Sequence, residues 1–149
     1  IFDPAGIDLD SSGALYVADY ALKRVHKFDA DGKFIFKFGN FAALDVSASS
    51  PNGIYVADGD NRRIVKFSQD GSILSSFGSS GSGDGQFDPP QGLALDKSGN
   101  IYVSDLGNRR VQKFDADGKF IFKFTYPETG APEIDPVGIK VDPAGNIFV

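Results

Sequence analysis

The stretch KFDADGKFIFKF occupies residues 27–38 and recurs without a change at residues 113–124. The two copies lie 86 residues apart, which is twice 43, and a diverged copy, KFSQDGSILSSF, stands between them at residues 66–77. In each copy an Asp-Gly pair separates two apolar runs, which is the strongest short signal for a β-hairpin. The repeat therefore predicts a chain built from β-type units of about 43 residues.

Each unit is expected to contain four short strands. In the first unit the strand-like runs are residues 6–10, 15–19, 24–28 and 34–38. Apolar residues alternate with others in the first run, which is the period of a strand, and no segment keeps a helical period. A Tyr-Val-Ala/Ser-Asp run marks the second strand of the units at residues 16–19, 55–58 and 102–105. The predicted fold class is all-β.

A period near 43 residues with four strands per unit is typical of a β-propeller, whose blades are four-stranded antiparallel sheets around an axis. We expect one propeller segment, with units at residues 1–40, 41–85, 86–130 and 131–149, the last of them partial. These units supply about 14 strands, so the ring is expected to be incomplete. The remaining blades of the same protein or a second copy would complete it, because an arc of repeats leaves an apolar face at each end.

Three segments of the third unit resemble the NHL repeat: DPPQGLALD at residues 88–96, GNIYVSD at 99–105 and NRRVQKF at 108–114. The resemblance extends over essentially the whole chain, as three units and the first half of a fourth. It implies a propeller, most often with six blades. The second unit departs from the pattern, because Ala43-Leu44-Asp45-Val46 lacks the leading Pro-x-Gly.

Composition excludes several classes of protein. A hydrophobic fraction of 41% in 149 residues is too high for a disordered chain. Zero cysteines exclude disulfides, thiolate metal sites and thiol nucleophiles, and a single histidine argues against a multi-histidine metal site. We therefore expect no metal and no cofactor. No apolar run approaches the roughly 20 residues of a membrane-spanning helix, and no secretory leader is recognised, so no membrane contact is expected.

A carboxylate ends the second strand of each unit, and an arginine opens the third. Such a carboxylate can accept hydrogen bonds from the following turn and pair with the arginine. Because these residues recur in every unit, we predict that they form structural pairs: Asp19 with Arg24, Asp58 with Arg63, and Asp105 with Arg110. His26 breaks the repeat, since Val65 and Gln112 stand at its position in the other units, and it is predicted to be a structural or surface residue.

Candidate partner-binding residues lie in the turns and in the loops between units. One extra basic residue precedes the arginine of each pair: Lys23, Arg62 and Arg109. The alternative is that these three residues are merely solvated charges. Residues 79–85 read as a mobile loop between units, and the loop one unit later adds Tyr126, Glu128 and Glu133 to the candidates. In a meander of four strands, all these positions share one face, and most of the aspartates of the other turns share the opposite face.

Three functions compete at this point. The leading hypothesis is a non-catalytic interaction scaffold that presents propeller loops to a protein partner, because the chain lacks a nucleophile–base pair and NHL propellers mostly mediate binding. The alternative is a propeller enzyme, a metal-dependent lyase or lactonase-like protein with its site on the axis. The residues aligned with such a site do not form a ligand ring: Asp8, Asp45, Ala94 and Lys140.

The second alternative is binding of single-stranded RNA through the arginine-bearing face. A pI of 4.7 argues against nucleic acid, because affinity for it depends on a net positive footprint. The sequence does not determine the compartment. Many microbial proteins with NHL-like repeats are secreted or lie on the cell surface, so the resemblance implies such a location.

Overall fold

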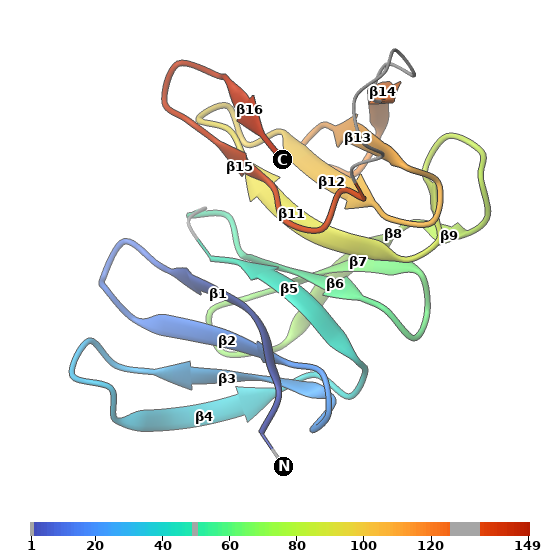
Figure 1. The fold of residues 1–149 in the computed structure, drawn as a ribbon. Coiled ribbons are helices and arrows are strands. Elements are labelled where there is room, and N and C mark those ends of the chain that lie inside the picture. The colour runs from blue at the N-terminus through green and yellow to red at the C-terminus, as the bar shows by residue number, and fades with distance from the viewer. Residues whose placement is uncertain (1, 49–50, 126–134) are drawn as a thin grey trace.

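Three antiparallel sheets and a C-terminal hairpin make up most of the fold in the computed structural model, which describes residues 2–48, 51–125 and 135–149. In each sheet four strands lie in chain order (Figure 1). The first sheet contains β1 (Pro4–Leu9), β2 (Leu15–Asp19), β3 (Arg24–Phe28) and β4 (Phe34–Phe38). The second contains β5 (Ala43–Ser47), β6 (Ile54–Asp58), β7 (Arg63–Phe67) and β8 (Ile73–Phe77). The third contains β11 (Pro90–Leu95), β12 (Ile101–Asp105), β13 (Arg110–Phe114) and β14 (Phe120–Thr125), and the hairpin pairs β15 (Lys140–Val141) with β16 (Ile147–Phe148).

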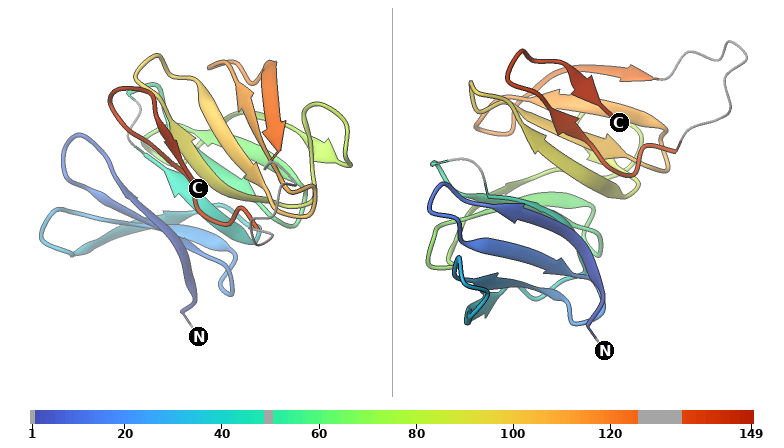
Figure 2. Two further views of the ribbon diagram at one scale, coloured as in Figure 1. Left: turned by 45° about the horizontal axis from the view of Figure 1, so that its top comes forward. Right: turned by 60° about the vertical axis from the view of Figure 1, so that its left-hand side comes forward.

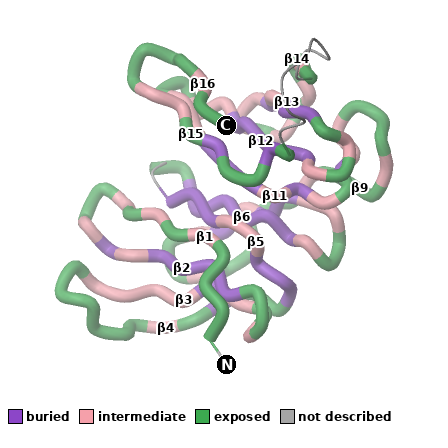
Figure 3. The backbone as a smooth tube through the Cα atoms, in the orientation of Figure 1, coloured by how far each residue is buried: buried purple, intermediate pink, exposed green. Residues whose placement is uncertain are grey.

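The sheets lie face to face in chain order, like the blades of a fan, and do not close into a ring (Figure 2). One apolar cluster fills the space between the first and second sheets, with Tyr16, Val25 and Phe67 among its members. A second cluster lies between the second and third sheets, and a third lies between the third sheet and the hairpin. The middle strands are the most buried, and β1 and the outer strands are more exposed (Figure 3).

Aspartate side chains close the turns between the first two strands of a unit. Asp10 Oδ1 accepts the N–H groups of Ser12 at 2.9 Å and Ala14 at 3.0 Å, and Gly13 follows with φ of 81°, which glycine adopts without steric cost. Burial alone would raise the pKa of Asp10, but these hydrogen bonds outweigh it and hold the pKa below its ordinary value. The Asp-x-x-Gly pattern therefore determines where β1 ends and β2 begins.

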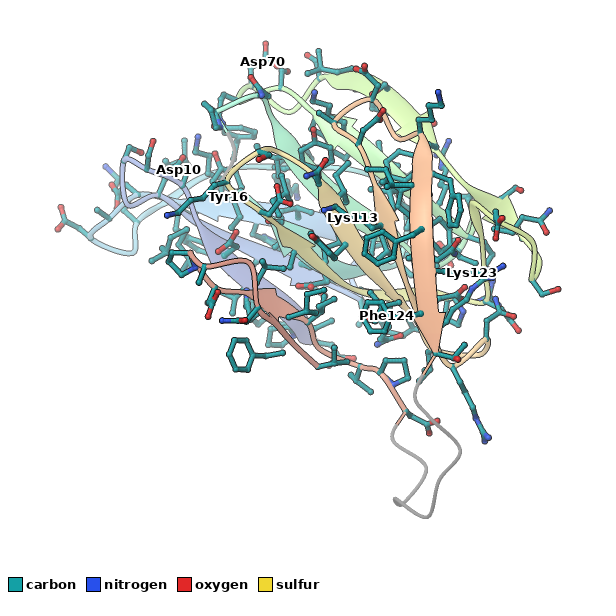
Figure 4. All side chains as sticks on the ribbon, turned by 90° about the horizontal axis from the view of Figure 1, so that it is seen from above. Asp10, Tyr16, Asp70, Lys113, Lys123 and Phe124 are labelled. Carbon is teal, nitrogen blue, oxygen red and sulfur yellow. The ribbon has the colours of Figure 1, made fainter. Side chains whose placement is uncertain are left out.

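A tyrosine and a lysine join this turn at the rim of the first sheet. The hydroxyl of Tyr16 lies 3.2 Å from Asp10 Oδ2 and donates to Gln69 of the second unit at 2.7 Å. Lys27 Nζ stands 4.9 Å from the centre of the Tyr16 ring. Figure 4 shows Asp10 and Tyr16 side by side at this rim. The same trio recurs in the third sheet as Asp96, Tyr102 and Lys113, so these residues serve the repeat.

The predicted all-β propeller architecture with an incomplete ring is confirmed. The 14 expected strands are present, and the described chain has two more, β9 (Ser79–Ser80) and β10 (Gln86–Phe87), which pair in parallel. Of the segment 79–85, which was expected to be a mobile loop, residues 79–80 therefore form a strand of a small sheet, and residues 81–85 form the turn that leads to its second strand. Its Gly-Ser composition suggested a linker, but the fully buried Phe87 anchors it to the core. No helix long and apolar enough to cross a bilayer occurs in the described ranges.

Candidate functional site

A buried ion pair organises the rim of the third sheet. Asp105 ends β12, and its Oδ2 accepts the Nε–H of Arg110 at 2.8 Å; both side chains are almost fully buried. Asn108 donates to both oxygens of Asp105, and the N–H of Asp88 donates to Oδ1 at 2.8 Å. The remaining nitrogens of Arg110 donate, at 2.7–2.9 Å, to the carbonyls of Ser82, Gly83 and Gln86. Arg110 therefore ties the segment before β11 to the sheet.

Gln112, which stands at the position of His26 and Val65 in the other units, extends this arrangement. Its amide donates to the Gln86 carbonyl at 2.7 Å, and its Oε1 accepts the N–H of Gly85 at 3.0 Å. The predicted pair of the second sheet is also present, because Arg63 Nε donates to Asp58 Oδ2 at 2.9 Å.

The predicted pair of the first sheet does not form. Arg24 Nε donates to the carbonyl of Leu22 at 2.7 Å, and His26 Nε2 lies 3.3 Å from Asp19 Oδ2 in place of the arginine. Neither His26 Nε2 nor Asp19 Oδ2 has a hydrogen-bond partner among the described residues. The reason is the side chain at the position of Val65 and Gln112: in the first sheet it is His26, and its imidazole lies in front of the carboxylate.

The extra basic residues occupy one repeated position at the same rim. Lys23, Arg62 and Arg109 have left-handed backbones, with φ of 54°, 55° and 49°, in the turns after β2, β6 and β12. Each forms an ion pair with the following unit: Lys23 with Asp60 at 3.0 Å, Arg62 with Asp88 at 3.7 Å, and Arg109 with Asp135 at 3.8 Å. The candidates therefore connect neighbouring units and remain partly exposed. Three further candidates lie outside the described residues: Tyr126, Glu128 and Glu133.

The innermost strands β1, β5, β11 and β15 line a cleft of about 430 Å³. A bulge inserts one extra residue near the start of each of the first three strands, because Pro4 pairs with Asp19 while Gly6 pairs with Ala18. The extra residues line the cleft, together with the corresponding residue of the fourth unit: Ala5, Leu44, Gln91 and Val137.

Asp45 is one of two ionisable side chains in the lining of this cleft, and Lys140 is the other. Asp45 Oδ2 accepts the N–H of Leu93 in β11 at 2.7 Å, and a Cβ on Gly6 of β1 would overlap Asp45 Oδ1. Burial raises the pKa of Asp45 to about 6, although its backbone hydrogen bonds and the nearby Lys140 favour the carboxylate. Asp45 thus links the innermost strands of three units.

The alignment of Asp45 with Asp8 is wrong by two residues. The strand register places Asp45 opposite Ala57, where the other sheets have Gly6 and Gly92, and it places Ser47 at the position of Asp8. Because the second unit lacks the Pro-x-Gly landmark, the sequence alone left its first strand without an anchor. Counting back from the Tyr-Val-Ala-Asp runs would have revealed an aspartate at a glycine position.

The cleft brings Asp45 near Lys140, but within the described ranges no three His, Cys, Asp or Glu residues are grouped so that they could hold a metal ion. The rim instead offers a basic side chain in the same turn of three successive sheets, and the cleft offers the half-buried carboxylate of Asp45 among mainly apolar residues.

Stacked four-stranded antiparallel sheets define the class as a β-propeller. The NHL repeat family model matches residues 87–114, which confirms the resemblance in the third unit. No curated protein matches the chain.

Among solved structures, the chain is similar to a streptogramin B lyase, with a TM-score of 0.76 and 20% identity over 99% of this chain and 48% of that one. The chain is also similar to a catalytically inactive variant of virginiamycin B lyase from Staphylococcus aureus, solved with quinupristin. The TM-score is 0.74 and the identity 16%, and the match covers 98% of this chain and 48% of that one. A protein of unknown function from Bacteroides thetaiotaomicron is similar with a TM-score of 0.72 and 19% identity, over 95% of this chain and 43% of that one. The chain thus spans about half the length of these structures, and at such identities the likeness concerns the fold.

Proposed function

We propose that the chain belongs to a non-catalytic interaction scaffold whose propeller rim binds a protein partner. The observation that carries this proposal is the row of Lys23, Arg62 and Arg109, held in the same left-handed turn on three successive sheets. A non-glycine residue with positive φ costs roughly 1 kcal/mol, so a rigid core is holding long cations at fixed spacing.

The ion pairs of this row can open at little cost. Exposed pairs contribute about 0–1 kcal/mol, since water and salt screen them. A partner surface that carries carboxylates can therefore replace Asp60, Asp88 or Asp135 as the acceptor of these cations. The matching partner is a protein with acidic side chains spaced like the rim.

A pair of triple variants tests the proposal. K23E/R62E/R109E reverses the row, and K33E/K97E/K119E makes the same change of charge in exposed turns of the opposite rim. Proteins cross-linked to the wild type in an extract of the source cells are compared with those cross-linked to each variant. We expect the first variant to lose partners that the control keeps; equal capture by both would contradict a role for this rim.

A second candidate is an enzyme with its site on the axis. Two observations support it: Asp45, with its pKa raised to about 6, lies at the cleft, and similar solved structures are named as lyases. The test is incubation of the protein with quinupristin, followed by mass spectrometry, beside the variant D45N. Consumption of quinupristin by the wild type but not by D45N would favour the enzyme. If quinupristin is unchanged, the protein does not act on this substrate.

A further inference from the structure

A cavity of about 520 Å³ lies at the rim that carries the cationic turn residues, where the first three units meet. The first unit contributes Tyr20 to its lining, the second contributes Arg62, and the third contributes Gln91. Lys23 bonds to Asp60, another residue of the lining, so two of the three cations of the row stand at this cavity. This cavity is the rim pocket.

The floor of the rim pocket departs from the repeat. Tyr20, Gly59 and Leu106 follow the aspartates that end the second strands, and each donates its N–H to a carbonyl at the entry of its own unit. Only the middle one of these three residues lacks a side chain. Leu44 packs so closely on Gly59 that a Cβ there would lie 2.6 Å from Leu44 Cδ1. The pocket therefore has a low apolar floor at a position where the other two units carry a large side chain.

Two polar side chains bring unused hydrogen-bonding groups to the pocket. Asp60 Oδ2 accepts the N–H of Ala42 and the Lys23 ammonium, each at 3.0 Å, whereas its Oδ1 accepts no hydrogen bond within the described chain. The Ala42 N–H above all, and then Lys23, hold the pKa of Asp60 below its ordinary value, so it is a carboxylate at neutral pH. The Gln91 side chain also forms no hydrogen bond with the described residues. A peptide backbone supplies the N–H and C=O groups that these side chains can bond.

An aromatic ring and a loosely paired cation complete the pocket. Tyr20 is 50% exposed, and its side chain makes no ring contact or hydrogen bond within the described ranges. The Arg62 side chain is 35% exposed, and its pair with Asp88 spans 3.7 Å, which is beyond hydrogen-bond distance. The ring can therefore stack with an aromatic ligand group, and the guanidinium can form a closer, two-pronged pair with a carboxylate.

We propose that the rim pocket anchors the protein partner by an aromatic residue that stands next to an acidic one. The aromatic ring stacks on Tyr20, the acidic side chain takes the place of Asp88 at Arg62, and the backbone between them bonds to Asp60 and Gln91. This inference rests on the proposed function, because it names the segment of the partner that the rim binds. A nucleotide also combines a ring with an anion, but the Asp60 carboxylate repels a phosphate and accepts the N–H that a peptide supplies.

Capped dipeptides test the pocket in the 149-residue chain, with NMR signals of the tyrosine rings and arginine side chains as the readout. N-acetyl-Phe-Glu-amide and N-acetyl-Glu-Phe-amide are compared first, and the tighter of the two is matched with versions that carry Ala for Phe or Gln for Glu. We expect loss of the ring to weaken binding about fivefold. Loss of the charge should weaken it about threefold. Adenosine 5′-monophosphate is titrated as a further probe.

Two variants assign the two contacts. Tyr20→Ala should erase the preference for Phe over Ala in the probe, and Arg62→Gln should erase the preference for Glu over Gln. Leu106→Ala, at the equivalent turn position of the third sheet, and Lys33→Gln, in an exposed turn of the opposite rim, should keep both preferences. Equal binding of all dipeptides, preferences that survive in the first two variants, or tighter binding of the nucleotide than of the dipeptides would each overturn the proposal.

The failure of this inference is distinguishable from the failure of the proposed function. In the cross-linking comparison, loss of partners by K23E/R62E/R109E together with full capture by Tyr20→Ala would overturn the pocket and leave the rim as the docking surface. Full capture by the triple variant, with the dipeptide preferences intact in the wild type, would support the pocket and contradict the proposed function.

Discussion

The identical stretches at residues 27–38 and 113–124 lie in the first and third sheets, and they are buried differently. Phe114 is completely buried between the second and third sheets, whereas its twin Phe28 is only half-buried. The order reverses at the other end of the stretch, because Phe38 packs into the cluster between the first and second sheets and is buried, while Phe124 packs beside the C-terminal hairpin and is only partly buried. Twelve identical residues therefore form the same hairpin turn and fourth strand, but the neighbouring sheet decides which of their rings enter the core.

The largest effect is expected from removing the two twin rings one at a time. Phe114→Ala should lower the free energy of unfolding by about 3–5 kcal/mol, because it leaves a cavity between two sheets. Phe28→Ala should cost about 1–2 kcal/mol, since part of that ring already contacts water. Urea denaturation of both variants measures the difference, and equal losses would mean that the first sheet is covered in solution.

The second largest difference in stability is expected between alanine variants of the equivalent arginines Arg110 and Arg24. Arg110→Ala removes four hydrogen bonds and leaves Asp105 buried, so we expect a loss of about 3 kcal/mol, near the lower limit for a broken buried pair because Asn108 still bonds the carboxylate. Arg24→Ala should cost less than about 1 kcal/mol, as its bond is to a turn carbonyl. A larger loss at Arg24 than at Arg110, in thermal or urea unfolding, would contradict the pairing described above.

Asp45 touches both sheets of the comparison, through Leu93 of the third and Gly6 of the first, and it should make stability depend on pH. The pKa of Asp45 is about 6 in the folded chain and near 3.9 in the unfolded chain, so the folded state keeps the proton up to a higher pH. The resulting stabilisation is complete below about pH 4 and is lost as the pH rises through 6. The stability of the wild type minus that of D45N should fall by roughly 2–3 kcal/mol from pH 4 to 7.5; a difference that does not change with pH would contradict the shift.

The smallest effect separates the aspartates at the entries of the two sheets. Asp88→Asn breaks the exposed pair with Arg62 and should cost less than about 1 kcal/mol at low salt and nothing in 1 M NaCl. Asp3→Asn should be neutral at both salt concentrations. Paired unfolding curves at the two ionic strengths measure this, and a salt-sensitive loss at Asp3 would show that a cation already reaches it.

Strand positions were predictable because turn chemistry and alternation are local. Asp10 and Gly13 specify their turn in any context, and the four-strand order follows from short connections. The partner of Arg24 was not predictable in this way. The repeat favours a pair with Asp19, as the arginines of the other two sheets form with their aspartates, but the His26 ring lies in front of that carboxylate and Arg24 bonds to the carbonyl of Leu22.

In the candidate site, too, features set by the local sequence were predictable and features set by tertiary packing were not. The basic turn residues were recognised from the sequence because they recur, but their left-handed backbone and their pairs with the next unit depend on how the sheets stack. Asp45 was misplaced because the second unit lacks the Pro-x-Gly landmark, and a strand of five residues is too short for its alternation alone to fix the register.

The bulges on the inner strands have a consequence for change over time. Their extra residues pair with no opposite residue, so the ladder places few demands on those side chains, and Ala5, Leu44 and Gln91 differ from one unit to the next while facing the cleft. Single substitutions at these positions can therefore change the chemistry of the cleft lining without disrupting the sheets. A designer who wished to give this scaffold a new ligand would begin at these positions.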